Sequence, residues 1–146
     1  TIQFGQLLAE NVVAGDTVLL YGDVGVGKTA LARSCIQARL SEIGAMEDVP
    51  SPTYTLVQVY DLTTTQIWHA DLYRLTSHQE AVELGLEEAF ETSISLIEWP
   101  DRLGDLSQYS PLNIAFSSGA SDSERHLKLQ GSASIWAPRL QGLSDE

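Results

Sequence analysis

The chain has little cysteine and little lysine, and both shortages limit what it can be. Cys35 is the single cysteine among 146 residues, so the chain can form neither an internal disulfide nor a zinc site built on several cysteines. Its place in a helical pattern is typical of a small core residue. Only two lysines occur, Lys28 and Lys128, so a lysine inside a functional motif stands out.

Positive charge is scarce in general, because 8 basic residues stand against 20 acidic ones and the formal net charge is −12. Such an excess of acid argues against unaided binding to nucleic acid or to an anionic membrane, since both depend on clustered lysine and arginine. No apolar run approaches the ~18 residues of a membrane span, and no signal peptide opens the chain. We expect a cytoplasmic protein without membrane contact.

The length and composition suit one packed domain over residues 1–146, with 43% hydrophobic residues to fill its core. Hydrophobic periodicity and turn residues predict alternating helices and strands. The expected helices cover 2–13, 28–40 and a stretch from a Ser77 cap to about 91, and the expected strands cover 17–21, 54–60, 66–71, 94–98, 112–116 and 127–129, with one helical turn near Trp136. This order predicts a layered α/β fold with a mixed sheet.

Residues 22–29 match the phosphate-loop pattern G-x-x-x-x-G-K-[ST] without departure. The context also fits, because an apolar strand precedes the loop and a helix follows it. Glycines let several backbone N–H groups surround a phosphate at a helix N-terminus, Lys28 can reach the β- and γ-phosphates, and the Thr29 hydroxyl can ligate Mg²⁺. The alternative is a glycine-rich turn without a ligand. The pattern favours a nucleotide site.

Two carboxylates are placed to complete such a site. Glu98 ends the strand 94–98 and Asp71 ends the strand 66–71, and the carboxyl ends of strands are where open α/β sheets bind ligands. Each is a candidate partner of Mg²⁺. Alternatively, each is a solvated strand end or a helix cap, and Asp71 pairs with Arg74. His69 is more simply a packed or hydrogen-bonded strand residue.

Two further segments have a functional and a plain interpretation. Thr53 lies between the helix 28–40 and the hairpin, where phosphate-loop proteins place a switch loop that senses the γ-phosphate; a simple loop-to-strand junction is the alternative. A series of acidic residues near the expected third helix is either a solvated face or a docking surface for a basic partner. Its members are Glu80, Glu83, Glu87, Glu88 and Glu91.

Four sequence blocks together resemble the TsaE family. They are Gly22–Thr29, SPTYTLV at 51–57, HADLYRL at 69–75 and EWP at 98–100. The phosphate loop alone is shared by many families, whereas the other three blocks in this order and spacing are specific. The resemblance implies a P-loop containing nucleoside triphosphate hydrolase fold, with three layers, α/β/α, and a mixed central sheet.

The resemblance also implies a function. It implies binding of ATP and Mg²⁺, slow ATP hydrolysis, and assembly with the TsaB and TsaD proteins that make threonylcarbamoyladenosine at position 37 of tRNA. The transfer itself would belong to TsaD, the ATPase would support its turnover, and tRNA would be contacted only through these partners. Carried onto this sequence, Thr29 and Glu98 would hold Mg²⁺, Asp71 would serve hydrolysis and Thr53 would belong to the switch loop. The phosphates would be held by Val24, Gly25, Val26, Gly27, Lys28 and Thr29.

Three other functions fit a phosphate loop. A small-molecule kinase generally neutralises the transferred phosphate with several clustered arginines, and those of this chain are scattered along the sequence. A GTPase switch needs an Asn-Lys-x-Asp motif, which does not occur. A nucleotide-binding scaffold without hydrolysis is the third alternative.

Overall fold

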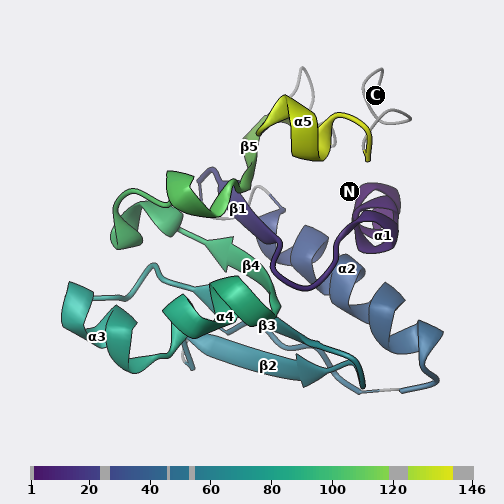
Figure 1. The fold of residues 1–146 in the computed structure, drawn as a ribbon, viewed down its shortest axis with the longest axis horizontal. Helices are drawn as coiled ribbons and strands as arrows, with labels where there is room; N and C mark the ends of the chain where they lie inside the picture. The colour runs from purple at the N-terminus through teal and green to yellow at the C-terminus, as the bar shows by residue number, and fades with distance from the viewer. Residues whose placement is uncertain (1, 24–26, 46, 53–54, 119–124, 140–146) are drawn as a thin grey trace.

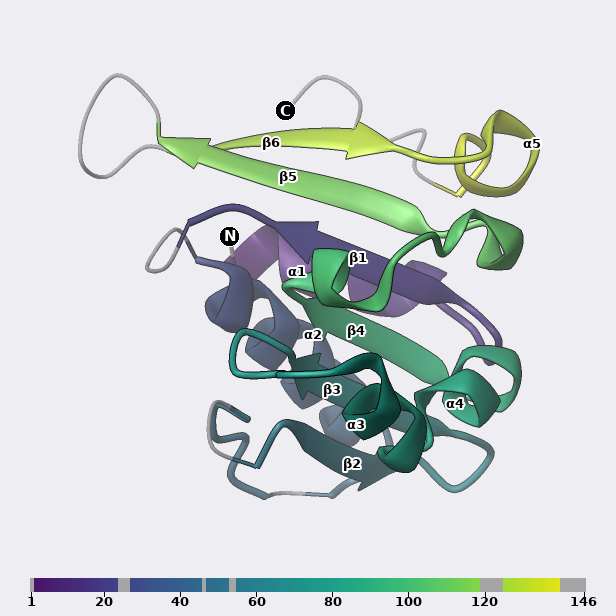
Figure 2. The same cartoon turned by 90° about the vertical axis from the view of Figure 1, so that its left-hand side faces the viewer.

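A mixed sheet of six strands forms the centre of the molecule. The computed structural model describes residues 2–23, 27–45, 47–52, 55–118 and 125–139. In the order β2-β3-β4-β1-β5-β6, the inner four strands are parallel and each edge strand is antiparallel to its neighbour (Figure 2). This confirms the predicted α/β fold. The strands are β1 (Thr17–Tyr21), β2 (Val57–Asp61), β3 (Gln66–Asp71), β4 (Ile94–Glu98), β5 (Leu112–Ser118) and β6 (Arg125–Gln130).

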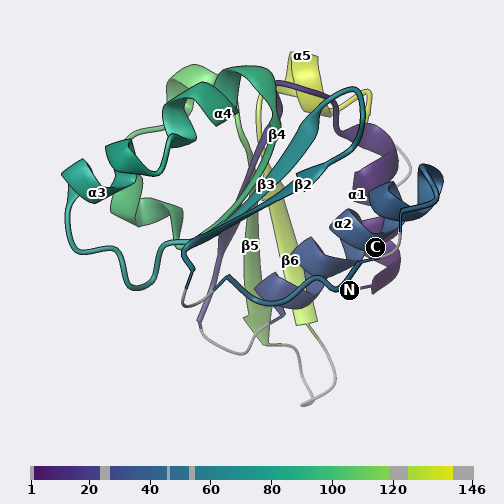
Figure 3. The same ribbon diagram turned by 90° about the horizontal axis from the view of Figure 1, so that it is seen from below.

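Helices cover both faces of this sheet, and Figures 1 and 3 show α1 and α2 on one side and α3 and α4 on the other. Strands buried on both faces read as continuous apolar runs, as TVLLY of β1 and ISLIE of β4 do. None of the described helices is long and apolar enough to cross a membrane. The helical segments are α1 (Ile2–Asn11), α2 (Lys28–Glu42), α3 (His78–Glu83), α4 (Leu86–Thr92), the 3₁₀ turns η1 (Pro100–Leu103) and η2 (Ser107–Tyr109), and α5 (Ala133–Trp136).

The alternation of side chains along β1 separates two hydrophobic cores. Val18 and Leu20 face the core beneath α1 and α2, where Cys35 is fully buried as predicted. Leu19 faces the core beneath α3 and α4. The two cores hold the parallel strands between helical layers, which fixes the edge where β1, β3 and β4 end.

The prediction of one helix from Ser77 to 91 is wrong, because two short helices occupy this stretch. Ser77 caps α3 as predicted, its hydroxyl accepting a hydrogen bond from the Glu80 N–H at 3.2 Å. The helical path is then interrupted at Gly85, whose φ of +80° is a left-handed conformation that favours glycine. The break re-aims the chain, so that Leu86 and Phe90 of α4 reach the same core as α3.

Other predicted boundaries also differ from those observed. Strand β2 begins at Val57 instead of 54, and α2 continues past 40 to Glu42. Strand β5 runs on to Ser118, and β6 covers Arg125–Gln130 instead of 127–129. The antiparallel pairing of β5 with β6 explains their extra length, because it continues from Asn113↔Gln130 to Ser118↔Arg125.

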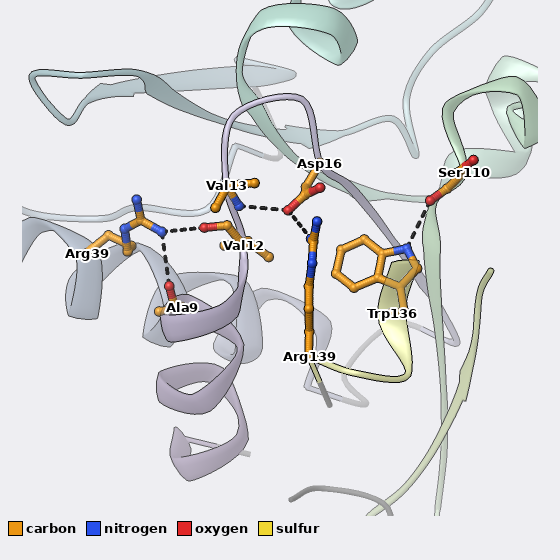
Figure 4. A network of polar contacts seen from close by, with 8 residues as sticks. All are labelled: Ala9, Val12, Val13, Asp16, Arg39, Ser110, Trp136 and Arg139. Atoms are coloured by element: carbon orange, nitrogen blue, oxygen red, sulfur yellow. Dashed lines mark hydrogen bonds and ion pairs between the residues drawn. The ribbon is translucent and has the colours of Figure 1, made fainter. Parts of the chain in front are cut away.

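A clasp joins the last described residues to the start of β1 (Figure 4). The Arg139 guanidinium donates to Asp16 Oδ2 at 2.6 Å and lies 4.8 Å from the centre of the Trp136 ring. The Trp136 indole in turn donates to the Ser110 carbonyl at 2.9 Å. Asp16 Oδ2 also accepts from the Val13 N–H at 2.7 Å. These four contacts form the clasp, which fastens α5 to the segments that precede β1 and β5.

Candidate functional site

The two predicted carboxylates lie side by side at one edge of the sheet. In the parallel pairing of β3 with β4, Asp71 is opposite Glu98, and in the pairing of β4 with β1, Glu98 is opposite Leu20. The phosphate-loop sequence begins directly after β1, so it starts beside Glu98, and Asp71 lies one strand further. Both carboxylates are buried: the exposed fraction is 7% for Asp71 and 2% for Glu98.

Thr29, at the start of α2, contacts the nearer of these carboxylates. Its hydroxyl Oγ1 donates a hydrogen bond to Glu98 Oε1 at 2.8 Å. Because the hydroxyl proton points to Glu98, the lone pairs of Thr29 Oγ1 are directed elsewhere and can accept a cation. A hydroxyl and a carboxylate held together in this way are oxygen ligands of the kind that Mg²⁺ prefers.

Lys28 is buried next to the same group of residues. Its ammonium donates to the Gly22 carbonyl and lies 3.7 Å from the centre of the Trp99 ring, and its side chain is almost fully covered. Burial lowers the pKa of Lys28 from its ordinary value of 10.5, and the carboxylates around it, Glu98 first, offset only part of that effect. A bound polyanion would favour the charged form and offset the effect of burial, so the site is electrostatically suited to phosphate.

Trp99 holds an unusual backbone conformation directly after Glu98. Its φ of +59° lies in the left-handed region, which is uncommon for a large residue and costs about 1–3 kcal/mol. The conformation places its ring between Lys28 and Tyr73, whose ring centre lies 4.8 Å away. Cation–π contact with Lys28 stabilises this arrangement.

His69 of β3 contacts Glu98 from the side opposite Thr29. Its Nε2 lies 2.7 Å from Glu98 Oε2, and the imidazole is completely buried. Each carboxylate oxygen of Glu98 therefore has its own partner, Thr29 on one and His69 on the other.

Asp71 is held by the backbone of the segments around it. Its Oδ1 accepts from the Tyr73 N–H at 3.1 Å, and its own N–H donates to the Leu56 carbonyl at 2.9 Å. The Leu56 N–H in turn donates to Pro52 at 2.7 Å. The hydrogen bond from Leu56 to Pro52 spans the segment that includes the predicted switch residue, and Leu56 joins that segment to Asp71. Thr53 itself lies outside the described residues.

The loop that would hold phosphates is described at its two ends. Val24, Gly25 and Val26 lie outside the described residues, whereas Gly27 precedes α2 in a left-handed conformation with φ +106° and without a side-chain cap. An uncapped helix N-terminus leaves N–H groups free for an anion. The residues at hand therefore fit a nucleotide phosphate group.

The same residues fit a magnesium ion only together with such phosphates. Within the described part of the chain, no group of three or more His, Cys, Asp or Glu side chains could hold a metal by itself. Thr29 and Glu98 supply two oxygens, and Mg²⁺ usually takes one or two protein ligands and completes its shell with phosphate and water.

The structure brings Lys28, Thr29, Asp71 and Glu98 together at one edge of the sheet and confirms the prediction that His69 is a packed or hydrogen-bonded strand residue. The partner of His69 and a site role for Trp99 were not predicted. One signal was available for His69. It stands two positions before Asp71 in β3, and residues two apart in a strand share a face. Trp99 had only its position directly after Glu98 as a signal.

Comparison with known proteins places the chain in a family. The family model for TsaE, described as threonylcarbamoyl adenosine biosynthesis protein TsaE, matches residues 1–127. The chain is 41% identical over 101 residues to the tRNA threonylcarbamoyladenosine biosynthesis protein TsaE of Rickettsia typhi, covering 69% of this chain and 68% of that protein. It is 41% identical over 107 residues to the protein of the same name from Haemophilus influenzae, covering 69% and 65%.

A solved structure supports the fold independently. The crystal structure of YdiB from Bacillus subtilis superposes with a TM-score of 0.72 over 99% of this chain and 86% of that one, at 23% sequence identity. This similarity concerns the fold alone. The match of the family model to residues 1–127 and the relatives at 41% identity show that this chain belongs to the TsaE family.

Proposed function

We propose that this chain is the ATP-binding and slowly ATP-hydrolysing component of the system that makes threonylcarbamoyladenosine in tRNA, with residues 1–146 acting as one ATPase domain. The names of its relatives support the pathway. The observation that carries the ATPase part is the contact between Thr29 and Glu98 at 2.8 Å beside the buried Lys28, because it joins a phosphate loop to a carboxylate of the neighbouring strand.

Different groups of the site hold the phosphates and the metal. The backbone of Val24 to Gly27 and the ammonium of Lys28 hold the phosphates, and Thr29 with Glu98 holds Mg²⁺. When bound, Mg²⁺ would neutralise charge on the β- and γ-phosphates. Lys28 adds a positive charge in a dry setting, where it acts more strongly on phosphate than in water.

Asp71 and Thr53 serve the hydrolytic step in this proposal. Asp71 is buried and fixed by the Tyr73 N–H, which suits a carboxylate that orients a water molecule toward the γ-phosphate. Thr53 lies in the segment bounded by Pro52 and Leu56, which is joined to Asp71 through the backbone. That connection supports a role for the segment in sensing the nucleotide.

Three of the six arginines have structural contacts that support slow hydrolysis and argue against a kinase lid built on them. Arg33 donates to the Val49 carbonyl, Arg39 to Ala9 and Val12, and Arg139 to Asp16. These three are engaged in structural contacts, so none of them is placed to stabilise a transferring phosphoryl group as a lid arginine does. A partner protein that supplies such a cation would accelerate the reaction.

TsaB and TsaD are the proposed partners, and tRNA is contacted through them. The net charge of −12 supports this division of labour, because an acidic chain repels a polyanion and attracts basic protein surfaces. A cytoplasmic location fits a tRNA-modifying system.

A reconstitution tests the proposal. We expect the chain to bind MgATP alone, to hydrolyse it faster with TsaB and TsaD present, and to be required for repeated rounds of tRNA modification. Transfer of the γ-phosphate to a metabolite would favour the kinase alternative. Binding without hydrolysis under every condition, including with both partners, would leave only a scaffold role.

A further inference from the structure

His69 places a polar ring where the surrounding sheet is apolar. It lies in β3, opposite Leu96 of β4, and its side chain has 0% exposure. Of its two ring nitrogens, Nε2 contacts Glu98 Oε2 at 2.7 Å, while Nδ1 finds no hydrogen-bond partner among the residues that the structure describes. A buried polar atom without a partner costs free energy that an apolar side chain at this position would avoid.

The contact with Glu98 fixes how the ring is oriented. A carboxylate can only accept a hydrogen bond, so Nε2 must carry the proton that lies between them. In the neutral ring, the unpartnered Nδ1 then carries a lone pair and no proton. Burying an acceptor without a partner costs less free energy than burying an N–H without one. Figure 2 shows β3 and β4 side by side, and their parallel register keeps His69 two positions before Asp71, on the face that Glu98 also occupies.

We propose that His69 is a positioning residue for the magnesium ligand Glu98. With Oε2 held by His69, the carboxylate cannot rotate, and Oε1 stays aimed at the Thr29 hydroxyl 2.8 Å away. The Thr29 hydroxyl then donates its hydrogen bond to Glu98 and keeps its lone pairs for the metal. This inference rests on the proposed function, specifically on the magnesium role of Thr29 and Glu98.

Two amide substitutions of similar polarity separate positioning from packing. In His69→Gln the amide nitrogen stands as many bonds from Cβ as Nε2 does, so it can still donate to Glu98. In His69→Asn the amide reaches only the place of Nδ1 and loses the contact. The readout is the ratio of the ATP dissociation constant in EDTA to that in Mg²⁺, measured by titration calorimetry without any turnover.

We expect His69→Asn to lower this ratio by about 10-fold or more, as loss of a supporting partner of a metal ligand does, and His69→Gln to keep it within about threefold of wild type. A purely structural role would lower the melting temperature of both variants and leave both ratios unchanged. That result would overturn the proposal.

Glu98→Gln distinguishes failure of this inference from failure of the proposed function. If Glu98→Gln itself leaves the ratio unchanged, the magnesium role of Glu98 is wrong. If Glu98→Gln lowers the ratio and His69→Asn does not, only the positioning role is wrong. In the double variant we expect no further loss beyond Glu98→Gln; a full additional loss would show that His69 does not act through Glu98.

A spectroscopic measurement covers the case in which His69→Asn does not fold. The ¹⁵N chemical shifts of the ring in the wild-type protein report which nitrogen carries the proton, and substitution of His78 and His126 assigns the signals. We expect the Nε2–H form for His69. A ring protonated on Nδ1 alone would contradict the proposal.

Discussion

The Thr29 hydroxyl donates to Glu98 Oε1 at 2.8 Å across 69 positions of sequence. This contact ties the first turn of α2 to the last residue of β4, so the loop after β1 and the carboxylate end of β4 form one unit. Neither residue could hold a metal strongly alone, because Mg²⁺ needs several oxygens in a fixed arrangement. Because one hydrogen bond joins the two side chains, a substitution at either residue is expected to change how the other is placed for the metal.

Thr29→Val is expected to remove most of the magnesium dependence of ATP binding. Valine has nearly the same shape but lacks the hydroxyl, so the metal loses a ligand and Glu98 loses a donor. We expect the gain in ATP affinity on adding Mg²⁺ to fall about 10-fold or more, as measured by calorimetry with Mg²⁺ and with EDTA. Thr29→Ser keeps the hydroxyl and should behave like wild type; equal losses in both variants would contradict this role.

When the pH is raised, ATP affinity is expected to begin to fall at a lower pH than it would if Lys28 had the pKa of an ordinary lysine. The pKa of Lys28 is lowered from 10.5 by burial, and phosphate binds only its charged form. As the pH rises through this lowered pKa, the free protein loses the charge, so binding must take up a proton and weakens. Calorimetry in buffers of different ionisation enthalpy measures that uptake.

Lys28→Arg provides the control for this pH dependence, because arginine stays charged throughout the range. Its ATP affinity should not change with alkaline pH in the way that wild type does. A wild-type affinity that stays constant up to pH 10.5 would argue against a lowered pKa of Lys28.

The clasp between Arg139 and Asp16 is expected to stabilise the fold. Arg139→Ala removes the 2.6 Å contact and should lower the free energy of unfolding by about 1 kcal/mol. Asp16→Ala also removes the bond to the Val13 N–H and should cost about 2 kcal/mol. Urea denaturation measures both. Arg102→Ala, on an exposed side chain of η1, serves as the control and should stay within about 0.5 kcal/mol of wild type.

Cys35 is expected to resist thiol reagents until the protein unfolds. Its side chain is fully buried, and burial raises its pKa from 9.0 to about 12. The rate of labelling under native conditions should therefore follow unfolding, and MgATP should slow it further because a ligand of the native state stabilises that state. Since the chain has no other cysteine, rapid labelling of the native protein would directly contradict this burial.

The same raised pKa predicts how stability depends on pH. Between pH 9 and about 12 the unfolded chain has released the thiol proton that the folded chain keeps. The unfolded state thus binds fewer protons, and the free energy of unfolding falls as the pH rises through this range. Cys35→Ala removes this contribution, so its stability should decline less steeply with alkaline pH.

The central strands could be predicted from the sequence because burial on both faces leaves continuous apolar runs. Strands β1 and β4 have the predicted bounds. The break at Gly85 could not be predicted with the same certainty, since an isolated glycine is tolerated within helices. The chain turns there because Leu86 and Phe90 must meet a core whose position depends on the whole sheet.

The residues of the candidate site also fall into two groups, those that the sequence predicts and those whose contacts it does not. Lys28 and Thr29 were found by a local motif, and Glu98 and Asp71 by their places at strand ends. The contacts of His69 and Trp99 depend on which strands are neighbours and on one backbone angle. The sequence pattern puts His69 on the same face as Asp71, but it contains neither of these quantities, so the contacts of His69 and Trp99 could be established only from the folded chain.

The two lysines of this chain allow a direct test of whether ATP binds at the loop ending in Lys28 and Thr29. Lys28 is buried at the proposed site, whereas Lys128 is exposed on the edge strand β6, which β5 separates from β1. Titration with MgATP should give a dissociation constant about 10-fold or more weaker for Lys28→Ala, and an unchanged one for Lys128→Ala. Equal affinities in the wild type and Lys28→Ala would contradict the account.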